Sequence, residues 1–248
     1  MTAGAALASI WRHPLKAIGR EEMGRADLVA GHGLPFDRRW AVTHERSQPI
    51  EGWAKKANFL RGVSGPELMA ATAELDAEGR RLTLRHPRAG TLTLDPDAPE
   101  DAARLTDWLG PLWPEDLPRP VAVARCETGF TDVPEPWVAI GNLASHRAVE
   151  SRVGRDLSMH RWRANLWVEG LDPWAEFDLV GQQFRIGGAV LEGRQRITRC
   201  KATMANPETG VRDADTLAAL RSWGHQDFGL YAEVIEGATV APGDEVTP

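Results

Sequence analysis

Hydrophobic and polar residues alternate in short runs along the first hundred residues, as they do in half-buried β-strands. The clearest case is RRLTLRHPRAGTLTLD, residues 80–95, in which Leu82 and Leu84 share one face. HPRAG supplies a turn, and two further leucines alternate on the returning strand. The pattern predicts a β-hairpin here and an early strand over LASIWRH, residues 7–13, in a β-rich N-terminal region.

Two segments instead combine helical spacing with residues that begin or end helices. DAPEDAARLTDWLG, residues 97–110, places Asp97 and Glu100 in the positions of a capping box. IGNLASHRAVESRVG, residues 140–154, offers Asn142 as an N-cap and ends on a glycine. Both segments are predicted to be helices.

The remaining pattern adds one more helix and several strands. DADTLAALRSWG, residues 213–224, has its apolar residues at roughly helical spacing. Residues 184–199 read as strand, and residues 229–246 read as strand, turn and strand. The chain is therefore predicted to be mainly β, in the α+β class, with a few short helices and a barrel-like arrangement rather than a doubly wound sheet.

A proline-rich segment divides this pattern. PLWPEDLPRP, residues 111–120, contains four prolines in ten residues, which disfavours both a helix and a central strand. We therefore expect a β-rich N-terminal domain over residues 1–110, a connector over 111–120 and a β-barrel domain with short helices over 121–248.

Composition narrows the range of partners. The net charge of −6 and the pI near 5.7 argue against a general affinity for nucleic acid or for an anionic membrane. Only two cysteines are present, fewer than a secreted disulfide scaffold uses, and the N-terminus lacks the pattern of a signal peptide. These features predict a cytoplasmic protein.

One of the two cysteines lies in a basic setting. Cys200 stands between Arg199 and Lys201 in RQRITRCKATMANPETG. In an unbulged strand, Arg194 and Arg196 would share its face, and guanidinium groups favour the thiolate that attacks electrophiles or binds soft metals. From spacing alone, a small buried hydrophobe at a strand end, with solvated arginines around it, is the favoured interpretation.

Other segments combine basic or amide side chains with turns or helix starts, as anion sites do. HPLKAIG carries Lys16, GLPFDRRW carries Arg38, and RWRANL carries Arg163 and Asn165. IGNLASHR opens a predicted helix with Ser145, where free backbone N–H groups could meet a phosphate. Each segment alone also fits a surface turn or an ion pair, and their joint occurrence favours an anion site. No Walker loop, GxSxG elbow or HExxH motif is present.

Taken in order, these segments resemble the MOSC family, the domain named after the C-terminal part of molybdenum cofactor sulfurase, together with its β-rich N-terminal companion. The resemblance runs nearly end to end and includes RWRANLWVEGLDPWAE, ITRCKATMANPETG and DFGLYAEVIEGATVAPGDEV. It implies a molybdenum cofactor (molybdenum–molybdopterin) with Cys200 as metal ligand and catalytic residue. It also implies that the pterin and phosphate are held by Lys16, Arg38, Ser145, Arg163 and Asn165.

The resemblance to amidoxime-reducing and hydroxylaminopurine-detoxifying members implies an oxidoreductase for small N-hydroxylated compounds. No ferredoxin-like segment is expected within this sequence, so electrons would come from a separate electron-transfer protein. The alternative is a cofactor carrier or a sulfur-transfer module with a persulfide on Cys200. Two departures from the family pattern stand out: Ala17 replaces a common serine, and Asn206 replaces a carboxylate expected near the metal.

Overall fold

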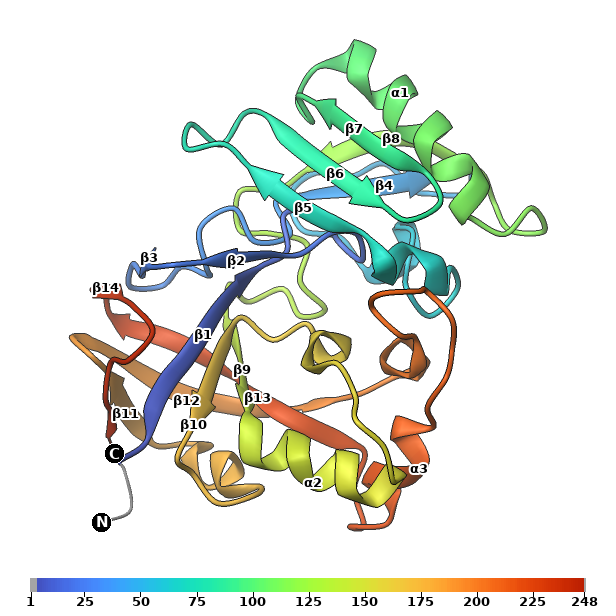
Figure 1. Ribbon diagram of the computed structural model, residues 1–248. Helices are drawn as coiled ribbons and strands as arrows, with labels where there is room; N and C mark the ends of the chain where they lie inside the picture. Colours follow the sequence, from blue (N-terminus) through green and yellow to red (C-terminus); the bar gives the residue numbers. More distant parts are fainter. Residues whose placement is uncertain (1–3, 248) are drawn as a thin grey trace.

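The computed structural model describes residues 4–247 and has two lobes, drawn one above the other in Figure 1. Each lobe is organised around its own β-sheet structure and its own apolar cluster. Among the described residues, no helix is long and apolar enough to cross a membrane.

The upper lobe packs two small sheets and a helix around one apolar cluster. Strand β4 (Trp40–His44) pairs antiparallel with β8 (Pro120–Arg125). Strands β5 (Thr72–Leu75), β6 (Leu82–His86) and β7 (Gly90–Leu94) form an antiparallel sheet, covered by helix α1 (Pro99–Leu109). The predicted hairpin is confirmed, because β6 and β7 pair and turn four leucines into this core: Leu82, Leu84, Leu92 and Leu94.

The lower lobe is built on one eight-stranded sheet, with the order β15-β11-β12-β13-β9-β10-β1-β2. Neighbours are antiparallel except β9 and β10, which are parallel. Its strands are β1 (Ala6–Arg12), β2 (Glu21–Met23), β9 (Val138–Asn142), β10 (Leu166–Glu169), β11 (Gln183–Ile186), β12 (Ala189–Thr198), β13 (Asp227–Glu236) and β15 (Val246–Thr247). A separate two-stranded ribbon joins β3 (Ala26–Asp27) to β14 (Thr239–Val240).

Two helices and several short 3₁₀ turns complete the molecule. Helices α2 (Leu143–Val153) and α3 (Thr216–Arg221) belong to the lower lobe, beside its sheet in Figure 1. The 3₁₀ turns are η1 (Lys56–Asn58), η2 (Pro66–Ala70), η3 (Gly110–Leu112), η4 (Met159–Trp162), η5 (Ala175–Leu179) and η6 (Lys201–Met204). The mainly β, α+β fold predicted from the alternation is therefore confirmed.

The three predicted helices are present, but their caps differ from the expectation in one case. At α2, Asn142 accepts a hydrogen bond from the backbone N–H of Ala144, and Gly154 ends the helix in the left-handed region at φ 80°. At α1 the predicted capping box is wrong. Asp97 lies before the N-cap and accepts from the Trp40 indole and the Arg125 guanidinium instead.

The two lobes exchange segments across the expected division of the chain. Strand β1, from the expected N-terminal domain, pairs with β10 in the lower sheet. Strand β8, which begins at the end of the connector, pairs with β4 in the upper lobe, where Leu112 and Trp113 are also buried. The proline-rich segment is thus anchored to the upper lobe by Leu112 and Trp113 rather than forming a free tether. The division into 1–110 and 121–248 as folding units stays a prediction.

Candidate functional site

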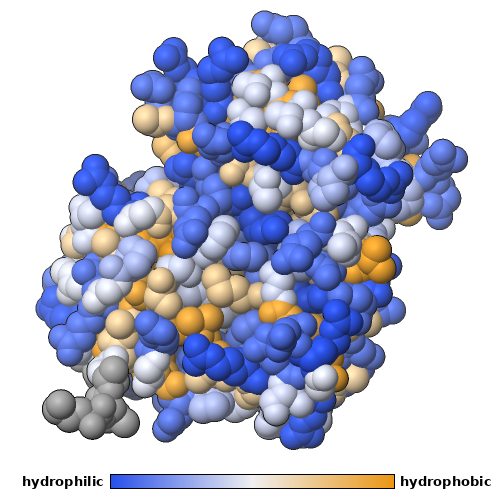
Figure 2. All heavy atoms as spheres, in the orientation of Figure 1, coloured by the Kyte–Doolittle hydropathy of each residue, from blue (hydrophilic) through white to orange (hydrophobic). Residues whose placement is uncertain are grey.

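A cavity of about 340 Å³ lies between the lobes and is lined by residues from both. In Figure 2 the surface between the two lobes is coloured mainly as hydrophilic. Five of the six predicted site residues line this cavity: Lys16, Arg38, Arg163, Asn165 and Cys200. Segments that are more than a hundred residues apart in the sequence therefore meet at one place.

The cavity is strongly cationic, in contrast to the net charge of −6 of the whole chain. Asp132 is the single acidic residue that lines it within residues 4–247. Its basic residues number seven: Lys16, Arg38, Lys56, Arg61, Arg161, Arg163 and Arg199. Such an excess of cations favours an anionic ligand.

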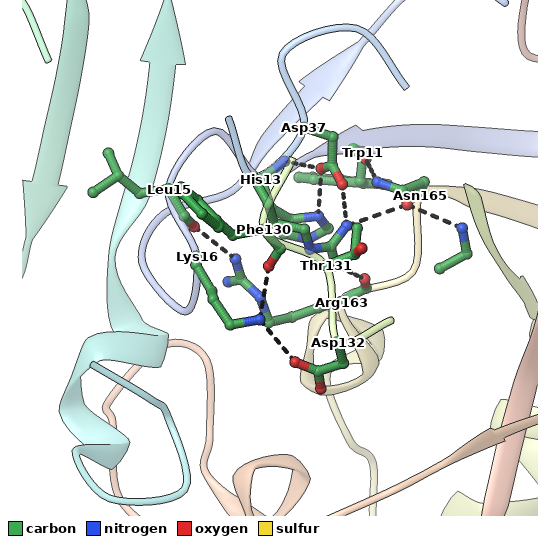
Figure 3. Close-up of polar contacts among 12 residues, drawn as sticks. Trp11, His13, Leu15, Lys16, Asp37, Phe130, Thr131, Asp132, Arg163 and Asn165 are labelled. Carbon is green, nitrogen blue, oxygen red and sulfur yellow. Dashed lines mark hydrogen bonds and ion pairs between the residues drawn. The ribbon is translucent and has the colours of Figure 1, made fainter. Parts of the chain in front are cut away.

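Lys16 contacts a segment more than a hundred residues later in the sequence (Figure 3). Its Nζ donates to the carbonyl of Phe130 and to Oδ1 of Asp132, both at 2.7 Å. Burial lowers the pKa of Lys16 from its ordinary value, and Asp132 partly offsets this. An ammonium group carries three N–H donors, so one donor remains for a ligand.

Arg38 is held from several sides. Its backbone is in the left-handed region at φ 49°, and its guanidinium pairs with Asp37 and donates to the Arg163 carbonyl at 2.7 Å. Burial alone would raise the pKa of Asp37, but Arg38 and His13 hold it well below its usual range. Asp37 therefore stays ionised and fixes Arg38 against the cavity wall.

Arg163 and Asn165, both labelled in Figure 3, each accept a hydrogen bond from the Arg38 guanidinium. Arg163, also left-handed at φ 50°, donates to the carbonyls of Gly19 and Leu15. Burial and the nearby Arg38 lower the pKa of Arg163 to about 9. Asn165 accepts from Arg38 at 3.2 Å through Oδ1. An arginine carries five N–H donors, so Arg163 keeps donors for a ligand.

Cys200 is exposed and lies where β12 runs into η6, as its N-cap residue. The expectation that Arg194 and Arg196 share its face is wrong. The register of β12 against β13 shifts at Gly193/Gln195 and again at Arg196/Thr198, which changes the alternation of faces.

The two upstream arginines are used elsewhere in the fold. Arg194 pairs with Glu192 and Glu233, and the guanidinium of Arg196 lies 4.3 Å from the centre of the Phe177 ring. Neither lines the cavity. The cation beside Cys200 is its chain neighbour Arg199.

Arg199 is anchored by backbone carbonyls rather than by a carboxylate. It donates to the carbonyl of Phe228 through Nε and Nη2, and to that of Trp162 at 2.7 Å through Nη1. Burial lowers the pKa of Arg199 to about 10, with a smaller opposing effect from Tyr231. A buried cation without a carboxylate partner is compensated when an anion binds beside it.

Ser145 is the predicted site residue that the structure does not bring to the cavity. It is fully buried, donates to Oε2 of Glu176 at 2.7 Å and accepts from the backbone N–H of Trp174. Asn142 also donates to that carboxylate oxygen, at 2.9 Å. An internal carboxylate thus takes the place beside the start of α2 where the sequence favoured a phosphate.

Asn206 does not line the cavity either, so its expected position near the metal is not observed. Its amide donates to Oδ2 of Asp213 at 3.0 Å, and its Oδ1 accepts from the backbone N–H of Glu208. Asp213 in turn pairs with Arg161, which does line the cavity. Asn206 therefore acts on the site through two intervening side chains.

Sequence reasoning missed several lining residues. Lys56 and Arg61 stand in a stretch with no recognisable motif, so nothing in the sequence marked them. Tyr231 also lines the cavity, and burial raises its pKa, which keeps its phenol protonated. It is the only tyrosine of the chain and lies in DFGLY, the segment that could have identified it.

These residues fit the cofactor that the sequence suggested. Spare N–H donors on Lys16 and Arg163 suit a phosphate, and the exposed sulfur of Cys200 suits a soft metal. Within residues 4–247, no cluster of three or more His, Cys, Asp or Glu side chains is placed to hold a metal ion. Cys200 is the one predicted metal ligand.

Comparisons with solved structures give only distant similarity. The YiiM protein from Geobacillus stearothermophilus is 20% identical over 44% of this chain and 52% of its own length, with a TM-score of 0.36. This chain thus spans about half of that protein. APC1665, the YUAD protein from Bacillus subtilis, is 12% identical over 98% of this chain and 94% of its own, with a TM-score of 0.47. No curated protein matches the chain.

Comparison with protein families is more informative. Residues 4–109 match the MOSC N-terminal beta barrel domain, and residues 131–247 match the MOSC domain. The two matches follow one another and leave only the segment around the connector and β8 between them. The chain therefore belongs to the MOSC family, with both its N-terminal domain and its MOSC domain.

Proposed function

We propose that this protein binds the molybdenum cofactor between its lobes and reduces small N-hydroxylated compounds, with Cys200 as the metal ligand. The observation that carries the proposal is the cavity itself. An exposed thiol and seven basic side chains line one space, and the chain belongs to a family associated with this cofactor. A phosphate at one end and a soft metal at the other would use both features.

The chain's own residues would first hold the cofactor. Lys16, Arg38 and Arg163 would donate to the phosphate, with Asn165 keeping Arg38 in place. Because their other donors are already bonded to the protein, these side chains are fixed before the ligand arrives, and little entropy is lost on binding. Ser145 has no part in this set.

Reduction of an N-hydroxyl group consumes electrons and protons and releases water. When bound, the molybdenum cofactor supplies the oxygen-atom and electron chemistry. The protein would contribute the thiolate of Cys200 and a proton held at Oη of Tyr231, whose raised pKa keeps it protonated. Electrons would come from a separate electron-transfer protein.

A second candidate function is a cofactor carrier or a sulfur-transfer module. The observation that favours it is that Cys200 is exposed, so its sulfur can be reached from outside and could carry a persulfide. Mass spectrometry of the metal-free protein distinguishes the two. A persulfide on Cys200, with no turnover by the metal-loaded protein, would support sulfur transfer.

The test of the proposed function is metal and pterin analysis of the wild type beside Cys200→Ser. The wild type is expected to contain both near stoichiometric amounts and to reduce benzamidoxime with reduced methyl viologen as donor. The variant is expected to lose most of its molybdenum and its turnover. Cys126→Ser is the matched control, because Cys126 is buried beside Phe59 and Phe130, away from the cavity. Full metal retention in Cys200→Ser rejects the ligand assignment.

A further inference from the structure

The basic residues of the cavity differ in how they are used. Five of them are tied to protein acceptors: Lys16, Arg38, Arg161, Arg163 and Arg199. Lys56 has one distant ion pair, with 3.9 Å between its Nζ and Oδ2 of Asp132. Among residues 4–247, the guanidinium of Arg61 has neither a hydrogen-bond acceptor nor an ion-pair partner. Of the seven cations, Arg61 is therefore the one for which residues 4–247 provide neither an acceptor nor an ion-pair partner.

The backbone that carries Arg61 is held firmly. The N–H of Leu60 donates to the Val42 carbonyl at 2.9 Å, which joins this segment to β4. The carbonyl of Arg61 accepts from the N–H groups of Ser64 and Gly65 at 3.0 and 2.9 Å. Because the turn is fixed at both sides, the guanidinium is presented from a defined point on the upper lobe.

This segment faces the turn that begins at Cys200. A Cβ atom on Gly62 would lie 3.6 Å from Cβ of Ala202 and 2.7 Å from the sulfur of Met69, so this backbone packs closely against the turn. Arg212 from the lower lobe donates to the Val63 carbonyl at 2.7 Å. Arg61 thus stands on the upper wall of the cavity beside the segment that carries the proposed metal ligand.

An unpaired guanidinium among six other cations is electrostatically unfavourable until an anion binds. Among the predicted phosphate ligands, Arg38 donates to the Arg163 carbonyl, and Arg163 donates to the carbonyl of Leu15, the chain neighbour of Lys16. Within residues 4–247, no hydrogen bond or ion pair joins Arg61 to these three residues. A second anion, other than the cofactor's phosphate, would account for Arg61.

We propose that Arg61 binds a negatively charged group of the substrate, so that the preferred N-hydroxylated compounds carry a carboxylate or a phosphate ester. This inference rests on the proposed function and names the substrate class of the same site. A guanidinium binds either anion through paired N–H donors, and lysine cannot reproduce that geometry.

The experiment compares benzamidoxime with 4-carboxybenzamidoxime and with a phosphate ester of 4-hydroxybenzamidoxime, using reduced methyl viologen as donor. The wild type is expected to have a KM about tenfold lower for at least one anionic compound than for the neutral one. The anionic compound with the lower KM shows whether the site prefers a carboxylate or a phosphate ester. Arg61→Ala should remove the preference and leave kinetics with benzamidoxime nearly unchanged, and Arg61→Lys should restore only part of it.

Two controls separate the possible failures. Arg85→Ala removes an exposed arginine from β6, where it pairs with Glu74, and should leave the preference intact. Molybdenum content should not change in Arg61→Ala; its loss would show that Arg61 serves the cofactor, and would overturn the inference. Equal KM values for all three compounds in the wild type would overturn it as well.

Calorimetric binding of the same compounds to the metal-loaded protein gives a readout that does not need turnover. If no compound is reduced but the anionic ones bind tighter, and Arg61→Ala abolishes the difference, the substrate-anion site stands while the reductase proposal fails. If benzamidoxime is reduced and the anionic compounds bind no tighter, the reductase proposal stands and the role of Arg61 is refuted.

Discussion

Two regions of this protein have the same anion-binding appearance in sequence and different uses in the fold. At the cavity, Lys16, Arg38 and Arg163 converge and keep N–H donors available. At the start of α2, Ser145 and its neighbours are already occupied by the buried carboxylate of Glu176. The comparison shows that a segment can bind an anion only if some of its N–H donors remain unused after folding. Whether they remain unused depends on residues that are distant in the sequence.

The largest expected effect is at Asp37, the carboxylate behind the cavity. Asp37→Asn removes the buried carboxylate that pairs with the partly buried Arg38 and opposes the charge of Arg163, and should lower the free energy of unfolding by about 3–5 kcal/mol. Because the folded-state pKa of Asp37 is depressed, this stabilisation is present above the unfolded value of about 3.9 and is lost as the pH falls through the lower folded value. Urea unfolding at several pH values measures it.

Glu74→Gln serves as the control for that measurement. Glu74 pairs with Arg85 on the exposed face of the β5–β6 sheet, and its loss should cost less than about 1 kcal/mol. Equal losses in the two variants would mean that the Asp37–Arg38 pair contributes no more than an exposed ion pair, and that Asp37 does not fix Arg38 at the cavity wall.

The next effect concerns Ser145 and tests the comparison directly. Ser145→Ala removes a donor to Glu176 and an acceptor for the Trp174 N–H, and should cost about 1–3 kcal/mol in unfolding free energy. Molybdenum and pterin content should be unchanged, whereas Lys16→Ala should lower both. Loss of cofactor from Ser145→Ala in a folded protein would return Ser145 to the ligand set.

The smallest effect is a pH dependence that comes from Glu176. Burial raises its folded-state pKa, so its contribution to stability is full below the unfolded value and is lost as the pH rises through the folded value. The unfolding free energy of the wild type, relative to Glu176→Gln, should therefore fall by about 1.4 kcal/mol per pH unit above roughly pH 4.3 and then level off. A flat difference curve would show that the carboxylate is ionised throughout.

The sequence predicted the fold more fully than the site, for physical reasons. Alternation and caps are local, so the β6–β7 hairpin and the Asn142 cap of α2 could be read from neighbouring residues. Which arginines share a strand face with Cys200 could not be read in this way. The irregularities in β12 arise from its pairing with β13 and are not visible in the alternation of residues along β12 itself. The role proposed for Arg61 was equally hidden, since it depends on its guanidinium meeting no acceptor among residues 4–247.

The placement of β1 has a consequence for synthesis on the ribosome. This strand is made first, yet its partner β10 lies about 150 residues later, so the pairing of Ala6 with Glu169 must wait for most of the polypeptide. The upper lobe can complete its own β4–β8 pairing earlier, once residue 125 has emerged. The oldest strand therefore waits for a late partner, and pauses in translation before residue 166 would leave the β10-facing edge of β1 open to capture by chaperones or by other chains.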